Sequence, residues 1–354
     1  MTNRPGDFRR LAGEPVFAVC GFSGSGKTTV LEWVIGELVG RGLCVGVVKH
    51  DAHGIEIDRP GKDSDRLYRA GAEVCLRARE ETVWRVHGRP ETSLEATLFS
   101  LLSWCDVVLV EGHKSTPLPK VWLSKENGAS PPPEVENVVA VLALDADRPA
   151  RTLAIVDARL TAAWRSRALL GGLLIGGDST RMARPKQLIE HAGRSFAEIA
   201  HTALAPHVEQ VVLLGGGEVP PSLADLPRLP DPPGLVGPLA GLAGAFGWAP
   251  RSAWVITACD LPHLTREAVA WLIERRAPGR RVILPTGPSG RVEPLLAVYE
   301  PHARAAVEEL VARGELAPRR LRGLPGVSSP AVPTHLARAW VNVNRPSDLE
   351  VVRD

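Results

Sequence analysis

One stretch near the N-terminus constrains the fold more than any other. The apolar run Val16–Cys20 leads directly into Gly21-Phe-Ser-Gly-Ser-Gly-Lys-Thr28, which fills every fixed position of the phosphate-binding loop pattern. Apolar residues then recur at helical spacing from Val30 to Val39, and Gly40 follows them. Strand, glycine loop and helix in this order predict a P-loop α/β domain, because the loop amides and the helix N-terminus then face bound phosphates.

The chemistry of this loop predicts a metal-assisted nucleotide site. Lys27 is expected to reach the outer phosphates, and the Thr28 hydroxyl can hold Mg²⁺. A second buried strand, Asp106–Glu111, ends in a carboxylate, and a carboxylate on a neighbouring strand completes the magnesium environment in P-loop proteins. Asp145 follows a further strand, and its carboxylate could accept hydrogen bonds from the edge of a base. The residues expected at the phosphates are Gly21, Ser23, Gly24, Ser25, Gly26, Lys27, Thr28 and Thr29.

A second pattern of strand and glycines begins at Gly171. The apolar run Leu173–Ile175 is followed by Gly176-Gly177. The backbone amides of glycines can approach an anionic ligand closely because no Cβ intervenes. Arg181 and Lys186 follow and would supply positive charge to a phosphate chain. We therefore expect a second phosphate site in this half of the chain.

Two oxygen-bearing residues further on favour a metal at that second site. The buried strand starting at Trp254 ends at Asp260, and Pro262 then forces the chain out of the strand. An aspartate at the carboxyl end of a central strand is a typical place for a hard cation such as Mg²⁺. Asn344 could complete the metal shell or cap a helix that begins near Ser347.

Length and charge limit the class of protein. The 354 residues predict two domains, at 1–165 and 166–354, and a net charge of +2 gives no reason to expect a nucleic-acid or membrane partner. The five cysteines lack metal-like spacing and several lie in apolar runs, as in proteins of the reducing cytoplasm. We also expect neither a signal peptide nor a membrane-spanning segment.

The first half resembles the molybdopterin-guanine dinucleotide biosynthesis adaptor family of P-loop GTP-binding proteins. The motifs behind this resemblance are 21–29, Val48-Lys-His50, Asp58-Arg-Pro-Gly-Lys-Asp-Ser64 and Leu109-Val-Glu-Gly112, across residues 14–157. The resemblance implies an accessory GTP-binding role, with Thr28 and Glu111 at the metal, and it suggests a homodimer through this domain. The Asn-Lys-x-Asp guanine signature is missing, so the residues themselves do not show base specificity here.

The second half resembles the molybdenum cofactor guanylyltransferases. The motifs are Gly176–Met182, Pro185-Lys186, Asp231, Gly237-Pro-Leu-Ala-Gly241, Cys259-Asp-Leu-Pro262 and Asn342-Val-Asn344. Two departures are Ala183, where the family usually has glycine, and Ile175, where it usually has a small residue. The resemblance implies a Rossmann-like nucleotidyltransferase domain with a mixed sheet, following the P-loop domain.

Together the resemblances imply a fusion of adaptor and transferase, in which tethering raises the local concentration of each for the other. GMP would pass from GTP to the terminal phosphate of molybdopterin or Mo-molybdopterin, with Mg²⁺ as cofactor. Lys186, Asp260 and Arg181 would be catalytic, and Asp260 and Asn344 would hold the metal. The GTP-binding set in this domain would be Leu174, Ile175, Gly176, Gly177, Lys186, Asp231 and Asp260.

Further partners and two alternatives follow from the same resemblance. Molybdoenzyme apoproteins and cofactor-insertion proteins are possible partners. A cytidylyltransferase that uses CTP on the same pterin is one alternative, because Pro185-Lys-Gln-Leu188 is similar to those enzymes. Gly176-Gly177 and the 237–241 loop favour guanine. The other alternative is a GTP-binding scaffold that delivers cofactor and carries an inactive transferase domain.

Overall fold

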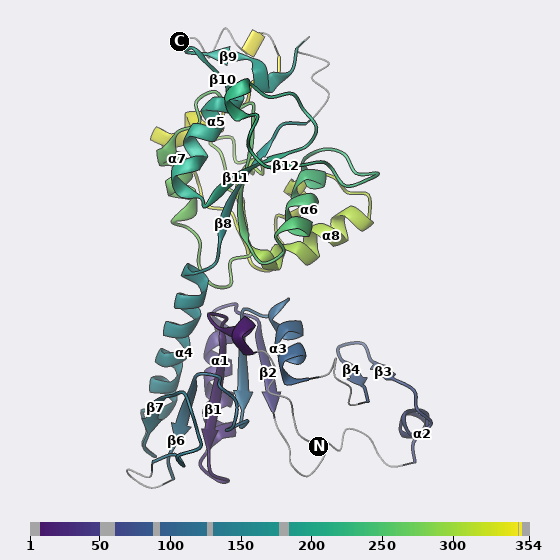
Figure 1. Ribbon diagram of the computed structural model, residues 1–354, viewed down its shortest axis with the longest axis vertical. Helices are drawn as coiled ribbons and strands as arrows, with labels where there is room; N and C mark the ends of the chain where they lie inside the picture. The colour runs from purple at the N-terminus through teal and green to yellow at the C-terminus, as the bar shows by residue number, and fades with distance from the viewer. Residues whose placement is uncertain are drawn as a thin grey trace. The chain divides into compact units, whose positions relative to one another are not determined.

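The computed structural model describes residues 8–49, 61–87, 93–125, 130–176, 184–345 and 347–348 (Figure 1). The chain divides into two compact units, one formed by Met1–Gly40 with Cys44–Leu160 and the other by Arg41–Leu43 with Thr161–Asp354. Among the described residues, none of the helices combines the length and apolar character needed to cross a bilayer.

The first unit is a parallel α/β domain. Its five-stranded sheet has the order β2-β5-β1-β6-β7, and β1 lies between β5 and β6 in parallel register. Its elements are β1 (Val16–Gly21), α1 (Lys27–Gly40), β2 (Val45–Lys49), α2 (Asp63–Arg69), β3 (Val74–Arg77), β4 (Thr82–Arg85), α3 (Leu94–Leu102), β5 (Val107–Glu111), β6 (Lys120–Leu123), β7 (Val138–Leu142) and the start of α4 (Arg148–Arg165).

The strand order brings the predicted ligand residues of this unit together. β1 and β5 are almost entirely buried, as expected for central strands of a parallel sheet covered on both faces. Val19 pairs with Glu111 across these two strands, so the P-loop after β1 and the carboxylate at the end of β5 share one edge of the sheet. Ligands of open α/β sheets bind at this carboxyl edge.

Residues 157–167 are polar and helix-prone, and the sequence indicates that they form the end of the first domain and a linker. In the structure, 157–165 is the second half of helix α4. Helix α4 is one helix of 18 residues that starts in the first unit and ends in the second. Val156, Leu160 and Trp164 are buried along it, and their spacing of four residues places them on one face of the helix. The helix therefore continues through the boundary between the units.

The second unit contains a mixed sheet, as predicted. Its seven strands have the order β12-β11-β8-β13-β15-β14-β16, and β15 runs antiparallel to both of its neighbours. Its main elements are β8 (Leu169–Leu174), β9 (Glu190–His191), β10 (Arg194–Ser195), α5 (Phe196–Leu204), β11 (Gln210–Leu214), β12 (Arg228–Leu229), α6 (Pro238–Trp248), β13 (Ala253–Ala258), α7 (Arg266–Ile273), β14 (Val282–Ile283), β15 (Leu296–Tyr299), α8 (Arg304–Ala312) and β16 (Val327–Ser328).

Helices cover both faces of this sheet, with α5 and α7 on one face and α6 and α8 on the other (Figure 1). Side chains alternate between the two cores along each strand: Leu213 packs with the α5 and α7 core, and Leu214 with the α6 and α8 core. β8 pairs with β13 in parallel, with Leu174 opposite Ala258, so the segments after these strands leave the sheet side by side.

Candidate nucleotide-binding sites

The glycines of the P-loop are required either by the space around them or by their backbone angles. A Cβ on Gly21 would lie 2.4 Å from the Ser25 hydroxyl oxygen and 2.6 Å from the Leu123 carbonyl oxygen, well inside contact distance. Gly24 and Gly26 have φ angles of +72° and +78°, which residues with a Cβ rarely adopt. The loop after β1 thus has the tight conformation that the motif predicts.

Thr28 and Glu111 meet, although they are 83 residues apart in the sequence. The Thr28 hydroxyl lies 3.1 Å and 3.2 Å from the two carboxylate oxygens of Glu111. A hydroxyl and a carboxylate are oxygen ligands of the kind that Mg²⁺ prefers. These two predicted ligands are therefore chemically suited to Mg²⁺. In the structure, the Thr28 hydroxyl donates a hydrogen bond to the Glu111 carboxylate.

Lys27 lies among other charges at this edge. Its ammonium group donates to the Phe22 carbonyl at 2.9 Å. Burial lowers the pKa of Lys27, Glu111 raises it, and the nearby cations Lys114 and Lys125 lower it further. Positive charges held close together repel one another, and an anionic ligand would relieve that repulsion.

Two of these cations were missed by the sequence reasoning. The Lys114 ammonium lies over the rings of Phe22 and Trp122, 4.9 Å and 5.4 Å from their centres. Lys125 reaches the loop at Gly24, where a Cβ would be 3.5 Å from its ammonium nitrogen. The signal for Lys114 was its place directly after Glu111-Gly-His, since side chains after neighbouring parallel strands gather at one edge.

The carboxylate of Asp145 is already paired. Arg151 donates to one of its oxygens, and this hydrogen bond lowers the pKa of Asp145. Backbone hydrogen bonds from Asp147 and Arg148 lower it as well, and the side chain is nonetheless 44% exposed. Its use as an acceptor for a base stays a prediction.

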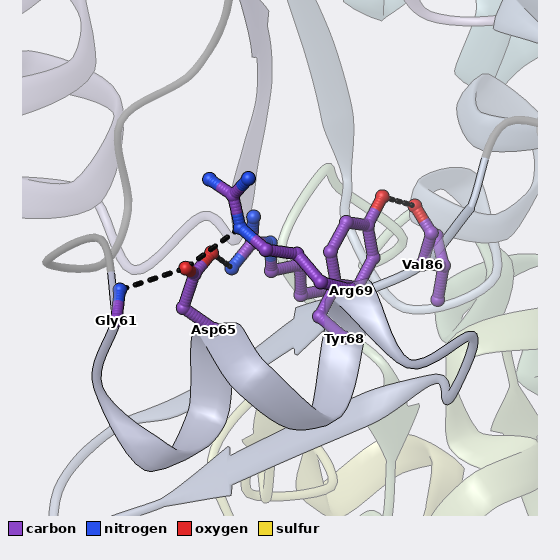
Figure 2. Close-up of polar contacts among 6 residues, drawn as sticks. Gly61, Asp65, Tyr68, Arg69 and Val86 are labelled. Carbon is purple, nitrogen blue, oxygen red and sulfur yellow. Dashed lines mark hydrogen bonds and ion pairs between the residues drawn. The ribbon is translucent and has the colours of Figure 1, made fainter.

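A separate ionic cluster orders the segment before α2. Asp65 is buried and accepts hydrogen bonds from the Gly61 amide at 2.9 Å, from Arg69 at 2.8 Å and from Arg85 at 3.0 Å (Figure 2). The Gly61 amide first, and then the two arginines, hold the pKa of Asp65 at about 2. Figure 2 also shows the Tyr68 hydroxyl donating to the Val86 carbonyl, at 3.3 Å. This cluster ties the end of the 58–64 motif to the hairpin β3–β4, while residues 58–60 lie outside the described part of the chain.

In the second unit, Ile175 and Gly176 follow β8 closely. The Ile175 amide donates to the Leu214 carbonyl at 2.9 Å, and Ile175 itself is buried. A Cβ built on Gly176 would lie 3.8 Å from a carboxylate oxygen of Asp231, so this predicted pair is close in space. Leu174 is the last residue of β8. Gly177, Arg181 and Ala183 lie outside the described residues, and their predicted roles stay predictions.

The sequence reasoning missed a second glycine turn that packs against the first. Gly215, Gly216 and Gly217 follow β11, the strand beside β8. A Cβ on Gly217 would lie 1.7 Å from the Ile175 carbonyl oxygen, so any larger residue would displace one of the two loops. The signal was present, because Gln210–Leu214 has the same order of apolar strand and glycines as the stretch at 171–177.

Lys186, Asp260 and Asn344 come together from three separate segments. The Lys186 ammonium donates to an Asp260 carboxylate oxygen at 2.9 Å and to the Asn344 side-chain oxygen at 2.7 Å. The backbone supports this arrangement, because the Val343 amide donates to the Asp260 carbonyl at 3.0 Å. Lys186 thus lies against both predicted metal ligands, a contact that the sequence did not indicate.

The oxygens at this cluster fit a magnesium ion. The second carboxylate oxygen of Asp260, Oδ1, is buried and has no hydrogen-bond partner among the described residues, and a buried oxygen without a partner is costly unless a ligand binds it. Asp260 and Asn344 offer oxygen donors only, and Mg²⁺ is typically held by one or two carboxylates together with phosphates and water. Within the described part of the chain, no group of three or more histidine, cysteine or acidic residues forms a protein-only metal site.

These features define the class of protein. A P-loop domain with a threonine–carboxylate pair is followed by a mixed-sheet domain with a glycine turn, a lysine and an aspartate at its carboxyl edge. That is the arrangement of a nucleotide-binding domain joined to a nucleotidyltransferase domain.

Comparisons with known proteins agree. Residues 16–145 match the family described as molybdopterin guanine dinucleotide synthesis protein B, and residues 171–326 match the MobA-like NTP transferase domain. The molybdopterin-guanine dinucleotide biosynthesis adapter protein of Haemophilus influenzae is 38% identical over 134 residues, which cover 36% of this chain and 74% of that protein. The molybdenum cofactor guanylyltransferase of Rhodobacter capsulatus is 33% identical over 193 residues, which cover 52% of this chain and 95% of that protein.

The chain therefore belongs to both families: it is a fused molybdenum cofactor biosynthesis protein with an N-terminal MobB domain and a C-terminal MobA-like nucleotidyltransferase domain homologous to molybdenum cofactor guanylyltransferases. Both resemblances drawn from the motifs are confirmed.

Proposed function

We propose that the C-terminal domain transfers GMP from GTP to the terminal phosphate of molybdopterin, and that the N-terminal domain binds a second GTP in an accessory role. The observation that carries the proposal is the cluster of Lys186, Asp260 and Asn344 beside the glycine turn after β8. The names of the relatives support guanine as the base and the pterin as the acceptor.

The reaction joins two anions. A phosphate oxygen of molybdopterin attacks the α-phosphorus of GTP, a new P–O bond forms, and the bond to the β-phosphate oxygen breaks to release pyrophosphate. The attacking oxygen is already ionised at neutral pH, so this chain needs no general base. Its task is to align two groups that repel each other and to stabilise the charge that moves onto the leaving group.

Lys186 suits this task because its present partners are exchangeable. Its side chain is 20% exposed, so the ammonium group has access to a ligand at the rim of the site. Asp260 and Asn344 would hold Mg²⁺, which supplies neutralising charge along the triphosphate. In that state the Lys186 ammonium group would no longer be needed by the Asp260 and Asn344 oxygens. It would be free to bind the phosphate chain.

A product assay with the full chain tests the proposal. We expect purified protein, molybdopterin, Mg²⁺ and GTP to give the guanine dinucleotide, seen by mass spectrometry, with one pyrophosphate released for each product. The Lys27→Ala variant should lose GTP binding in the first domain and keep basal transfer. Product with CTP alone would instead indicate a cytidylyltransferase. GTP binding without product would indicate a cofactor-delivery scaffold with an inactive transferase domain.

A further inference from the structure

Arg148 is a buried charge at the edge of the sheet that carries the P-loop. It is the first residue of α4, and it is only 2% exposed. None of the motifs discussed above includes it. Its guanidinium group nevertheless contacts the P-loop, whose Ser25 is 123 residues away in the sequence.

The guanidinium group donates to carbonyl oxygens from three loops. Nη1 donates to Ser25 in the P-loop at 2.8 Å, and Nη2 donates to Ser124, directly after β6. Nε donates to Ala143, directly after β7, at 2.5 Å, and Nη2 also reaches the last residue of β7, Leu142, at 3.3 Å. One side chain thus fixes the ends of β1, β6 and β7 relative to one another.

Only arginine has the geometry for this set of contacts. Its planar group carries five N–H donors that point in fixed directions, whereas lysine has three donors on a single nitrogen. Burial lowers the pKa of Arg148, as expected for a charge removed from water. Four carbonyl acceptors compensate for that loss of hydration.

The contact to Ser25 also orients an amide of the P-loop. A trans peptide unit is planar, so the Ser25 carbonyl and the Gly26 amide point in opposite directions. Because the carbonyl is turned toward Arg148, the Gly26 amide is turned away from it. Arg148 therefore fixes the direction of one of the amides that a P-loop can offer to a phosphate.

The residues directly after β6 and β7, Ser124 and Ala143, lie where the rest of a nucleotide would extend. The ends of β6 and β7 belong to the same carboxyl edge as the P-loop, and a nucleotide bound at such an edge crosses from one strand end to the next. Asp145, the predicted acceptor for a base, comes two residues after Ala143 and accepts hydrogen bonds from the Asp147 and Arg148 amides. Arg148 is thus linked to both the phosphate end and the base end.

We propose that Arg148 is a positioning residue that couples recognition of the phosphates by the P-loop to recognition of the base by the residues directly after β6 and β7. This inference rests on the proposed binding of GTP by the first domain. It predicts that the base contributes to affinity only while Arg148 fixes the spacing of the three loops.

The test compares GTP with inorganic tripolyphosphate, which lacks base and sugar, by calorimetry on the full chain at constant Mg²⁺. Asp260→Asn is present in every sample to limit turnover. We expect Arg148→Lys and Arg148→Met to weaken GTP binding at the first domain by about tenfold or more, as the loss of a hydrogen bond to a charged group would do. Tripolyphosphate binding should also weaken, because Arg148 fixes the P-loop at Ser25, but by a smaller factor than GTP binding, so the ratio of the two affinities changes against GTP.

Two control variants separate the possible outcomes. Arg165→Lys, an exposed arginine at the other end of the same helix, should leave both affinities unchanged. Lys27→Met should weaken the binding of GTP and of tripolyphosphate together. If the protein with an unaltered P-loop binds no GTP at the first domain, the proposed function of this domain is wrong. An unchanged ratio of affinities in both Arg148 variants would overturn the role of Arg148 alone.

Hydrogen exchange keeps the inference testable if the variants fold poorly. With Arg148 intact, tripolyphosphate bound at the P-loop should slow amide exchange in residues 142–147, which it does not reach directly. Exchange that changes only in the P-loop would show that the loops are not coupled, and would contradict the inference.

Discussion

Asp260→Asn is the variant that best tests the transferase site. The substitution keeps the size of the side chain and an oxygen that can face Lys186, but it removes the negative charge. The backbone contact to Val343 is unaffected, because it uses the Asp260 carbonyl. The change therefore isolates the carboxylate from the packing around it.

The structure sets the expected size of the effect. The pair joins atoms 2.9 Å apart, with side chains that are 20% and 12% exposed, so it is screened by water only in part. Because Lys186 can turn toward solvent, we expect the free energy of unfolding to fall by only about 1–2 kcal/mol. Turnover should fall by about 10²–10³, the usual cost of removing a preorganised charge that faces a transition state.

The assay is steady-state pyrophosphate release at saturating GTP and molybdopterin, with thermal unfolding measured on the same samples. Glu309→Gln is the matched control, because it removes a carboxylate of an ion pair on α8 that is 60% exposed. That variant should be near wild type in both assays. Turnover of Asp260→Asn within about threefold of wild type would refute the assignment of Asp260 to the reaction.

Three further predictions follow from particular contacts. Gly217→Ala should lower transferase activity more than tenfold, since its Cβ would meet a carbonyl 1.7 Å away, whereas Gly216→Ala, with open space around it, should be near wild type in the same pyrophosphate assay. Iodoacetamide at about pH 8 should alkylate the exposed Cys75 and spare the buried Cys259. Burial, and then the charge of Asp260, raise the pKa of the Cys259 thiol to about 12. Peptide mass mapping will show which of the two cysteines is alkylated. Asp65 has a folded-state pKa of about 2, below the usual 3.8. Its ionised carboxylate therefore stabilises the fold fully above pH 3.8, and this stabilisation is lost as the pH falls toward 2. In acid unfolding, Asp65→Asn should lack the loss of stability over this pH range.

The local elements could be predicted because consecutive residues decide them. Apolar runs at strand length, glycines at loop positions and helical spacing after Lys27 depend on backbone sterics and on hydrogen bonds between near neighbours. The predicted strand Asp106–Glu111 differs from β5, Val107–Glu111, only at its first residue. The helix-prone segment 157–167 is helical as far as Arg165, and the burial of Leu160 and Trp164 adds a tertiary reason that its polar composition does not show.

The contacts within each site depend on strand order, which no short stretch of sequence specifies. Lys186 meets Asp260 and Asn344 across 74 and 158 residues because the segment after β8 lies beside the segment after β13. By itself, then, the sequence determined which residue types could bind phosphate and magnesium, since each motif carries its own chemistry. Only the tertiary structure decided which of them meet, and only it revealed Arg148, because the partners of a buried guanidinium group are backbone carbonyls, and every residue in the chain has one.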